Sequence, residues 1–244
     1  MIKSVLQYIV KSKKIGKKLL AVLLDPDKVN LEDLPALSKK INKNADFIFV
    51  GGSTVSEGVT ENLVRSLKKK SSLPIVIFPG DHTQITEDAN AILFLSLLSG
   101  ENPEYLIKQQ IKSVSKLQRS QLEIIPTGYI LINGGHESSV QKVSKTKPVD
   151  STDISLATKI AIAGMYMGKQ LIYLEAGSGA KNPVPNSLLK KVAENLTIPI
   201  LVGGGIRTQK QLDDAYKNGA DVVVIGSAFE ENIEIFNHLS FSKF

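Results

Sequence analysis

Short apolar runs alternate with longer segments in which apolar and polar residues mix at helical spacing. The runs predict buried strands at 18–24, 46–50, 74–78, 91–97, 123–131, 171–174 and 200–202, and a last one within 221–227. Helices are expected up to about residue 14 and near 31–42, 61–70, 103–119, 154–167, 187–195, 209–218 and 230–239. This regular alternation of strand and helix is typical of a parallel β-sheet.

Eight such βα units predict a single (β/α)₈ barrel (TIM barrel) that occupies residues 1–244 as one domain. The length of 244 residues agrees with the roughly 250 of a typical barrel. No stretch has the composition of an interdomain linker. Two irregularities are expected: Pro126 and Gly128 should interrupt the fifth strand, and 132–153 should be a long irregular connection. In such barrels the active site lies at the carboxyl ends of the strands.

Composition narrows the classes of function. The chain has 42% hydrophobic residues and no cysteine, which excludes disulfides, a thiolate nucleophile and zinc–sulfur sites. The net charge of +6 comes from scattered lysines without interleaved aromatic residues, so no nucleic acid is expected as partner. Neither a signal peptide nor an apolar run long enough to span a bilayer is visible. We therefore expect a cytoplasmic protein with at most peripheral membrane contact.

Two glycine loops near the end of the chain predict a phosphate site. Gly203, Gly204 and Gly205 follow the seventh strand, and Gly226 and Ser227 follow the eighth. Glycines at such positions expose backbone N–H groups to which an anion can bind. One glycine triplet could equally form a tight turn. The pair of loops after the last two strands is the recurrent phosphate site of (β/α)₈ barrels.

Asp25 and Ser53 end the first two strands and are candidate ligands of Mg²⁺. Carboxylate and hydroxyl oxygens suit this ion, which usually keeps several waters and takes further oxygens from substrate phosphates. An alternative interpretation makes Asp25 and Asp27 helix caps, and the DPDK segment alone favours neither.

Glu175 ends the sixth strand and is the candidate catalytic residue. Alternation places it on the same face as Tyr173. A buried glutamate is costly without a partner or a task, and here it could act as general base or bind hydroxyl groups. A purely structural salt bridge is the alternative. The loop of Gly177, Ser178 and Gly179 can supply further N–H groups to the phosphate.

Other polar and aromatic residues are less informative. The three histidines, His82, His136 and His238, lack triad partners, and His82 is expected at the surface. Tyr105, at the start of the long helix after the fourth strand, either packs in the core or borders an apolar substrate groove.

Seven motifs together resemble the geranylgeranylglyceryl phosphate synthase family. They occur in the family's order: LLDPDK (23–28), GGS (51–53), FPG (78–80), NPEY (102–105), YLEAGSGA (173–180), GGGIR (203–207) and GS (226–227). The segment TGYILINGG (127–135) resembles the longer branch of this family. The pair Gly226-Ser227 stands where relatives commonly have Gly-Asn, and serine can still donate to phosphate.

The resemblance implies a Mg²⁺-dependent prenyltransferase that forms an ether between sn-glycerol 1-phosphate and an all-trans prenyl diphosphate, with geranylgeranyl diphosphate as the expected donor. It places the metal at Asp25 and Ser53, the prenyl groove at Phe78 and Tyr105, and the proton acceptor at Glu175. A homo-oligomer is expected. The residues implied for glycerol phosphate are Tyr173, Leu174, Glu175, Ala176, Gly177, Ser178, Gly179, Gly204, Gly205, Gly226 and Ser227.

Two other functions fit parts of the pattern. A sugar-phosphate isomerase shares the paired phosphate loops, and Asp25 with Glu175 could imitate its acid–base pair across the barrel mouth. A non-catalytic module that binds flavin phosphate or a prenyl lipid would need only the phosphate site. Turnover of prenyl diphosphate with Mg²⁺ separates the synthase from both, and a yellow protein would indicate flavin.

Overall fold

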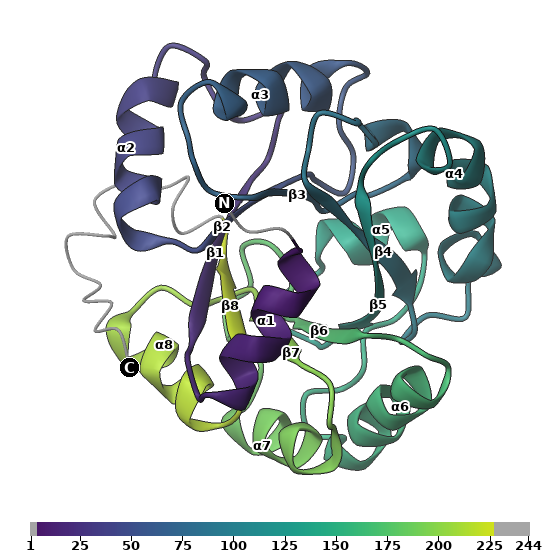
Figure 1. Cartoon of the computed structure of the whole chain (residues 1–244). Helices are drawn as coiled ribbons and strands as arrows, with labels where there is room; N and C mark the ends of the chain where they lie inside the picture. The colour runs from purple at the N-terminus through teal and green to yellow at the C-terminus, as the bar shows by residue number, and fades with distance from the viewer. Residues whose placement is uncertain (1–3, 227–244) are drawn as a thin grey trace.

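The computed structural model describes residues 4–226 and shows a closed barrel of eight parallel strands in sequential order, as predicted (Figure 1). Each strand pairs with its neighbours in the chain, and β8 closes the ring on β1. The strands are β1 (Leu19–Leu24), β2 (Phe47–Val50), β3 (Ile75–Ile77), β4 (Ala91–Leu97), β5 (Glu123–Leu131), β6 (Leu171–Glu175), β7 (Ile200–Gly203) and β8 (Val222–Ile225).

Helices surround the barrel, but not in eight regular βα units. Between β3 and β4 the described chain has only the 3₁₀ turn η1 (His82–Gln84), so the prediction of eight complete units is wrong there. The long helix expected after β4 begins as a π-helical turn, η2 (Glu104–Lys108), and continues as α4 (Gln109–Leu117). The other helices are α1 (Val5–Lys14), α2 (Leu34–Asn44), α3 (Val59–Lys68), α5 (Ser139–Ser144), α6 (Ile154–Tyr166), α7 (Asn186–Asn195) and α8 (Gln209–Lys217). The helix expected at 230–239 lies outside the described residues.

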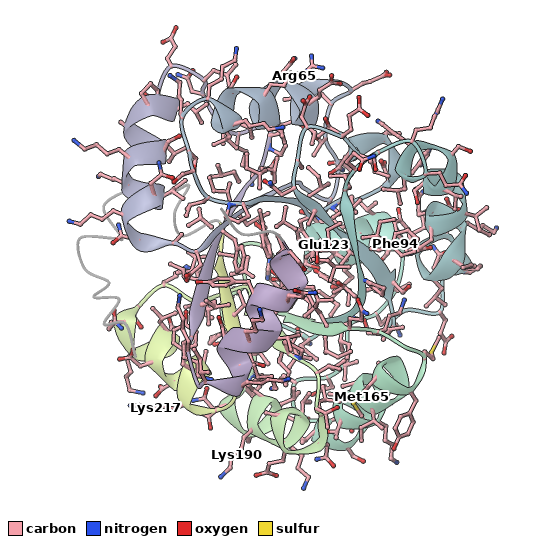
Figure 2. The ribbon with its side chains drawn as sticks, viewed as in Figure 1. Arg65, Phe94, Glu123, Met165, Lys190 and Lys217 are labelled. Atoms are coloured by element: carbon pink, nitrogen blue, oxygen red, sulfur yellow. The ribbon has the colours of Figure 1, made fainter. Side chains whose placement is uncertain are left out.

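Alternating residues of the strands build two separate apolar layers. Leu19 and Ala21 of β1 and Phe47 of β2 face the interior of the barrel. Leu20 and Ile48 lie in the other layer, between the barrel and its helices. Strands buried on both faces explain the near-continuous apolar runs in the sequence. Figure 2 shows the charged side chains of Lys190 and Lys217 directed away from this core.

Helix α1 lies across the amino-terminal end of the barrel (Figure 1). Its first backbone N–H groups, those of Val5 and Leu6, donate to the carboxylate of Glu123 at the start of β5 (2.5 and 3.1 Å). Ile9 packs with the interior residues of the barrel, and Lys13 forms an ion pair with Asp221 (2.9 Å). The helix thus covers this end, whereas the residues singled out in the sequence lie at the opposite end.

Two expectations about the region around β5 are wrong. The strand continues through Pro126 and Gly128, because the one missing N–H donor is tolerated and the Pro126 carbonyl still accepts from Gln170 (2.7 Å). The connection 132–153 is also more regular than expected. It contains α5 and a short bridge between Ile132 and Val149. Among the described helices, none is long and apolar enough to cross a membrane.

Candidate active site

Two cavities meet at the carboxyl ends of the strands. One is polar, and its lining includes Asp25, Ser53, Glu175, Ser178 and Gly204. The other is an apolar channel lined by the loop after β3, by β4, by the η2–α4 helix and by α5. Both cavities have the same five residues in their walls: Gly52, Ser53, Phe78, Tyr129 and Val140. A molecule with a charged head and an apolar tail therefore finds a place for each part in adjoining spaces.

Glu175 is the central ionisable group of the polar cavity. It ends β6 with only 6% of its surface exposed, and its Oε1 accepts a hydrogen bond from the Gly177 N–H at 2.7 Å. Burial raises the pKa of Glu175 to about 7, although the nearby Tyr173 hydroxyl and the Gly177 N–H oppose the rise. A carboxyl group that titrates near neutral pH can accept and return a proton under ordinary conditions.

Tyr173 places its hydroxyl beside this carboxylate. A Cβ added at Gly203 would meet the Tyr173 hydroxyl at 2.5 Å and Glu175 Oε2 at 2.6 Å, so both oxygens lie against the same glycine. The hydroxyl is fully buried and has no well-aligned hydrogen bond within the described residues. Buried polar groups rarely stay without a partner, and this one borders a cavity that a polar ligand can enter.

The loop after β7 passes so close to β6 that only glycine fits. Gly204 and Gly205 have φ values of 81° and 73°, and a Cβ on Gly204 would collide with Glu175 Oε1. Arg207 joins the loop after β7 to the loop after β6, because its Nη1 donates to the Ala180 carbonyl (2.7 Å). The glycines therefore allow the backbone of the loop after β7 to lie directly against the Glu175 side chain.

Not every residue expected in the phosphate loop offers a side chain or an N–H group to the cavity. The side chain of Leu174 packs in the outer layer between barrel and helices. The Ala176 N–H donates to the Gly203 carbonyl (3.0 Å). Ser178 and Gly226 do line the polar cavity, and Ser227 lies outside the described residues.

Asp25 and Ser53 lie on neighbouring strand ends in the wall of the polar cavity. The Asp25 carboxylate packs against Gly52, where an added Cβ would be 3.1 Å from Oδ1, and it forms an ion pair with Lys28 (3.3 Å). No cluster of three acidic or histidine ligands exists among the described residues. The donor set fits Mg²⁺ nonetheless, because this ion commonly takes one or two protein oxygens and completes its shell with water and phosphate.

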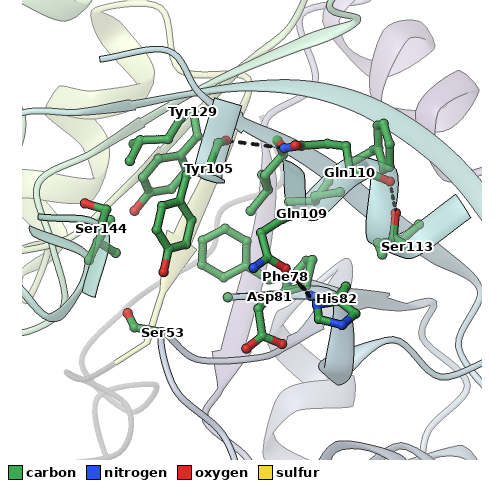
Figure 3. Close-up of a pocket in the computed structure, with 18 of the residues that line it drawn as sticks. Ser53, Phe78, Asp81, His82, Tyr105, Gln109, Gln110, Ser113, Tyr129 and Ser144 are labelled. Atoms are coloured by element: carbon green, nitrogen blue, oxygen red, sulfur yellow. Dashed lines mark hydrogen bonds between the residues drawn. The ribbon is translucent and has the colours of Figure 1, made fainter. Parts of the chain in front are cut away.

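Phe78 and Tyr105, the residues expected at a prenyl groove, both line the apolar channel (Figure 3). The Tyr105 hydroxyl donates to the Val143 carbonyl of α5 (3.4 Å). Apolar side chains make up much of the rest of the channel wall: Pro79, Ile85, Ile92, Leu93, Phe94, Leu95, Leu97, Val140 and Val143.

The expectation that His82 lies at the surface is wrong. It is half-buried in the channel wall, with 2.8 Å between its Nδ1 and Gln109 Oε1. His82 is the first residue of η1, the short turn between β3 and β4, and this connection places it beside the channel.

The sequence did not single out Tyr129, which lies in the wall of both cavities. Its ring contacts those of Tyr173 and Phe78, with centroids 5.4 and 6.0 Å apart. Inward alternation along β5 is the signal that could have found it, but the expected interruption of that strand obscured the alternation. Ser139 and Val140 of α5 were missed as well, because their segment was expected to be irregular.

The fold and the adjoining cavities define a (β/α)₈-barrel protein with a polar cavity beside an apolar channel at the carboxyl ends of its strands. The sequence model described as the PcrB family matches residues 12–240. The chain belongs to this family, and the resemblance noted from the motifs is confirmed.

Named relatives agree with this assignment. The geranylgeranylglyceryl phosphate synthase of Zunongwangia profunda is 54% identical over 226 residues, which cover 93% of this chain and 97% of the relative. That of Thermococcus kodakarensis is 42% identical over 219 residues, which cover 88% of this chain and 85% of the relative. The crystal structure of the Thermoplasma acidophilum enzyme in complex with its substrate sn-glycerol 1-phosphate has a TM-score of 0.91 and 31% identity, covering 98% of this chain and 96% of the other.

Proposed function

We propose that this protein is a prenyltransferase that joins the hydroxyl of sn-glycerol 1-phosphate to an all-trans prenyl diphosphate, with geranylgeranyl diphosphate as the donor. The observation that carries the proposal is the continuity between the polar cavity around Glu175 and the apolar channel beside Phe78. The names of the relatives, and the substrate bound in the Thermoplasma acidophilum enzyme, support this choice of substrates.

The reaction needs a proton acceptor close to the attacking hydroxyl. As the hydroxyl oxygen bonds to C1 of the prenyl chain, the bond from C1 to the diphosphate oxygen breaks and its electron pair leaves with the diphosphate. The hydroxyl proton passes to the Glu175 carboxylate. With a pKa of about 7, this carboxyl group is largely ionised at slightly alkaline pH and is basic enough to take the proton. The Gly177 N–H fixes its Oε1.

The glycerol phosphate is held by the loops after β6, β7 and β8. Gly204 and Gly226, which line the polar cavity, are assigned to its phosphate together with Gly205 of the same loop as Gly204, and the buried Tyr173 hydroxyl is assigned to a polar atom of the glycerol. Such positioning accounts for much of the rate when two bound substrates react.

Asp25 and Ser53 are assigned to a Mg²⁺ ion. When bound, the ion neutralises charge on the leaving diphosphate. Lys28 pairs with Asp25 and belongs to the same wall of the cavity, so a second positive charge lies near the place proposed for the diphosphate. The homo-oligomer and the cytoplasmic location stay predictions from the sequence.

Incubation with sn-glycerol 1-phosphate, Mg²⁺ and prenyl diphosphates of several lengths tests the proposal. We expect an ether product, identified by mass, with the highest yield from the geranylgeranyl donor. Absence of product with every donor would overturn the proposed function, and conversion of a sugar phosphate instead would favour the isomerase. A colourless purified protein would argue against the flavin-binding alternative.

A further inference from the structure

Three aromatic rings meet where the polar cavity opens into the apolar channel. The centroids of Phe78, Tyr129 and Tyr173 are 5.3–6.0 Å apart, and we call these residues the aromatic collar. Figure 3 shows Phe78 and Tyr129 beside the apolar channel. Phe78 and Tyr129 line both cavities, whereas Tyr173 lines the polar one and contacts Glu175.

The position of the collar follows from the two cavities. If the diphosphate lies in the polar cavity and the prenyl chain in the channel, the C1–oxygen bond that joins them lies beside the residues that line both cavities. The shared wall contains two rings, Phe78 and Tyr129, besides Gly52, Ser53 and Val140. The carbon that leaves the diphosphate therefore lies next to aromatic rings.

We propose that the aromatic collar, and the Tyr129 ring in particular, stabilises the positive charge that develops on the allylic carbon of the prenyl donor. This inference rests on the proposed function. As the bond from C1 to diphosphate oxygen breaks, its electron pair leaves with the diphosphate and the allylic system becomes electron-poor. The glycerol phosphate oxygen supplies the new electron pair in the same step, and its proton goes to Glu175.

Distances and burial favour such a role for Tyr129. Cation–π attraction acts within roughly 6 Å of a ring centroid and is strongest where water is excluded. Tyr129 is 4% exposed, and an atom seated over two collar rings lies within this range because the centroids are so close. Burial and the nearby Glu175 hold the pKa of the Tyr129 hydroxyl well above its usual value, so the ring stays a neutral phenol.

The test uses substitutions that lower the electron density of the aromatic ring at residue 129 stepwise. Tyr129→Phe keeps the aromatic face and is expected to retain most of the single-turnover rate. Replacing residue 129 by phenylalanines with one, two and three fluorines withdraws electrons from the ring stepwise at little cost in shape. The logarithm of the rate should fall steadily with the number of fluorines. Tyr129→Leu is expected to lose roughly thirtyfold, the equivalent of about 2 kcal/mol at 1.36 kcal/mol per tenfold.

The same fluorinated series at Tyr105 is the control, since Tyr105 lines the channel but not the polar cavity. Its slope should be much flatter than that at residue 129. If the wild-type protein is active but the rate does not change with the number of fluorines at residue 129, this inference is overturned and the proposed function is not. Failure of the wild-type protein to form the ether would overturn the proposed function and this inference with it. Should Tyr129→Leu not fold, the fluorinated series still decides.

Discussion

The polar cavity and the apolar channel are made from different parts of the polypeptide, although they share one wall. Backbone and strand-end residues make the polar cavity, where Gly204 approaches Glu175 so closely that no side chain fits. The channel instead depends on side chains from the loop after β3, from β4, from the η2–α4 helix and from α5, among them Phe78 and Tyr105. We infer that the polar cavity determines the chemistry and tolerates little change in its geometry. The apolar channel determines which apolar group is accepted, and its side chains can vary more easily.

The largest effect is expected from Glu175→Gln, which keeps the shape of the polar cavity but removes its base. The turnover number should fall by roughly 10²–10⁴-fold, the usual range for a lost general base. Glycerol phosphate binding should change much less. In the wild type, activity should rise with pH through about 7 as Glu175 ionises, and the variant should lack this step.

Single-turnover rates and calorimetric titration at several pH values measure both parts of this prediction. A near-normal rate in the variant would reduce Glu175 to a residue that binds the hydroxyl, and would indicate that the diphosphate ionises first.

Asp25→Asn should raise the Mg²⁺ concentration needed for half-maximal activity. A neutral amide is a weaker ligand than a carboxylate, and losses of roughly 10–100-fold in metal affinity occur even for residues that only support metal ligands. The fold should persist, because asparagine can still accept from the Asp27 N–H (3.2 Å). Activity against Mg²⁺ concentration, with circular dichroism as control, tests this. An unchanged Mg²⁺ dependence would remove Asp25 from the metal site.

Gly204→Val should weaken glycerol phosphate binding more than prenyl diphosphate binding. The branched side chain would displace Glu175 and occupy the space beside the backbone N–H groups proposed to approach the phosphate, whereas the positive φ costs a non-glycine residue about 1–3 kcal/mol of folding stability. Gly168→Val is a matched control, since Gly168 has a φ of 83° but open space around its Cα. Calorimetry with each substrate decides, and equal losses for both substrates would indicate misfolding.

A smaller and more selective effect is expected from Val143→Trp, which fills the channel from α5. The KM for long prenyl diphosphates should rise about tenfold, the cost of a poorly fitting apolar group. Glycerol phosphate affinity should stay the same. Leu156→Trp, at an exposed apolar position on α6, is the control. Steady-state kinetics with short and long prenyl diphosphates measures this selectivity. An equal rise in KM for both donors would contradict the prediction.

The last effect shows in stability rather than in turnover. The pKa of Glu175 is raised in the folded protein, so the folded state binds more protons than the unfolded state between the usual value of 4.5 and about 7. This carboxyl group therefore lowers stability as pH rises through that window. Glu175→Gln should be more stable than the wild type by up to about 3 kcal/mol at pH 8, and about equal to it at pH 4. Urea unfolding at the two pH values measures this, and an equal difference at both would contradict a buried, titrating carboxyl.

Local chemistry explains why much of the polar cavity was predictable from the sequence. Glu175 and Asp25 were found because each ends an apolar run, and parallel strands bring their carboxyl ends to one edge. The glycines were found because close backbone approach requires them. The His82 prediction failed because a histidine after a strand carries no local sign of whether a distant helix will cover it.

What the sequence by itself determined is the barrel, its open end and the strand-end residues, because alternation and strand order depend on neighbours along the chain. Only the tertiary structure decided the full lining of the channel, the half-buried position of His82 and the place of Tyr129 in the wall of both cavities. These features arise where the loop after β3, strands β4 and β5, and the η2–α4 helix come together. Contacts between residues so far apart in sequence depend on side-chain volume and register, which no local pattern specifies.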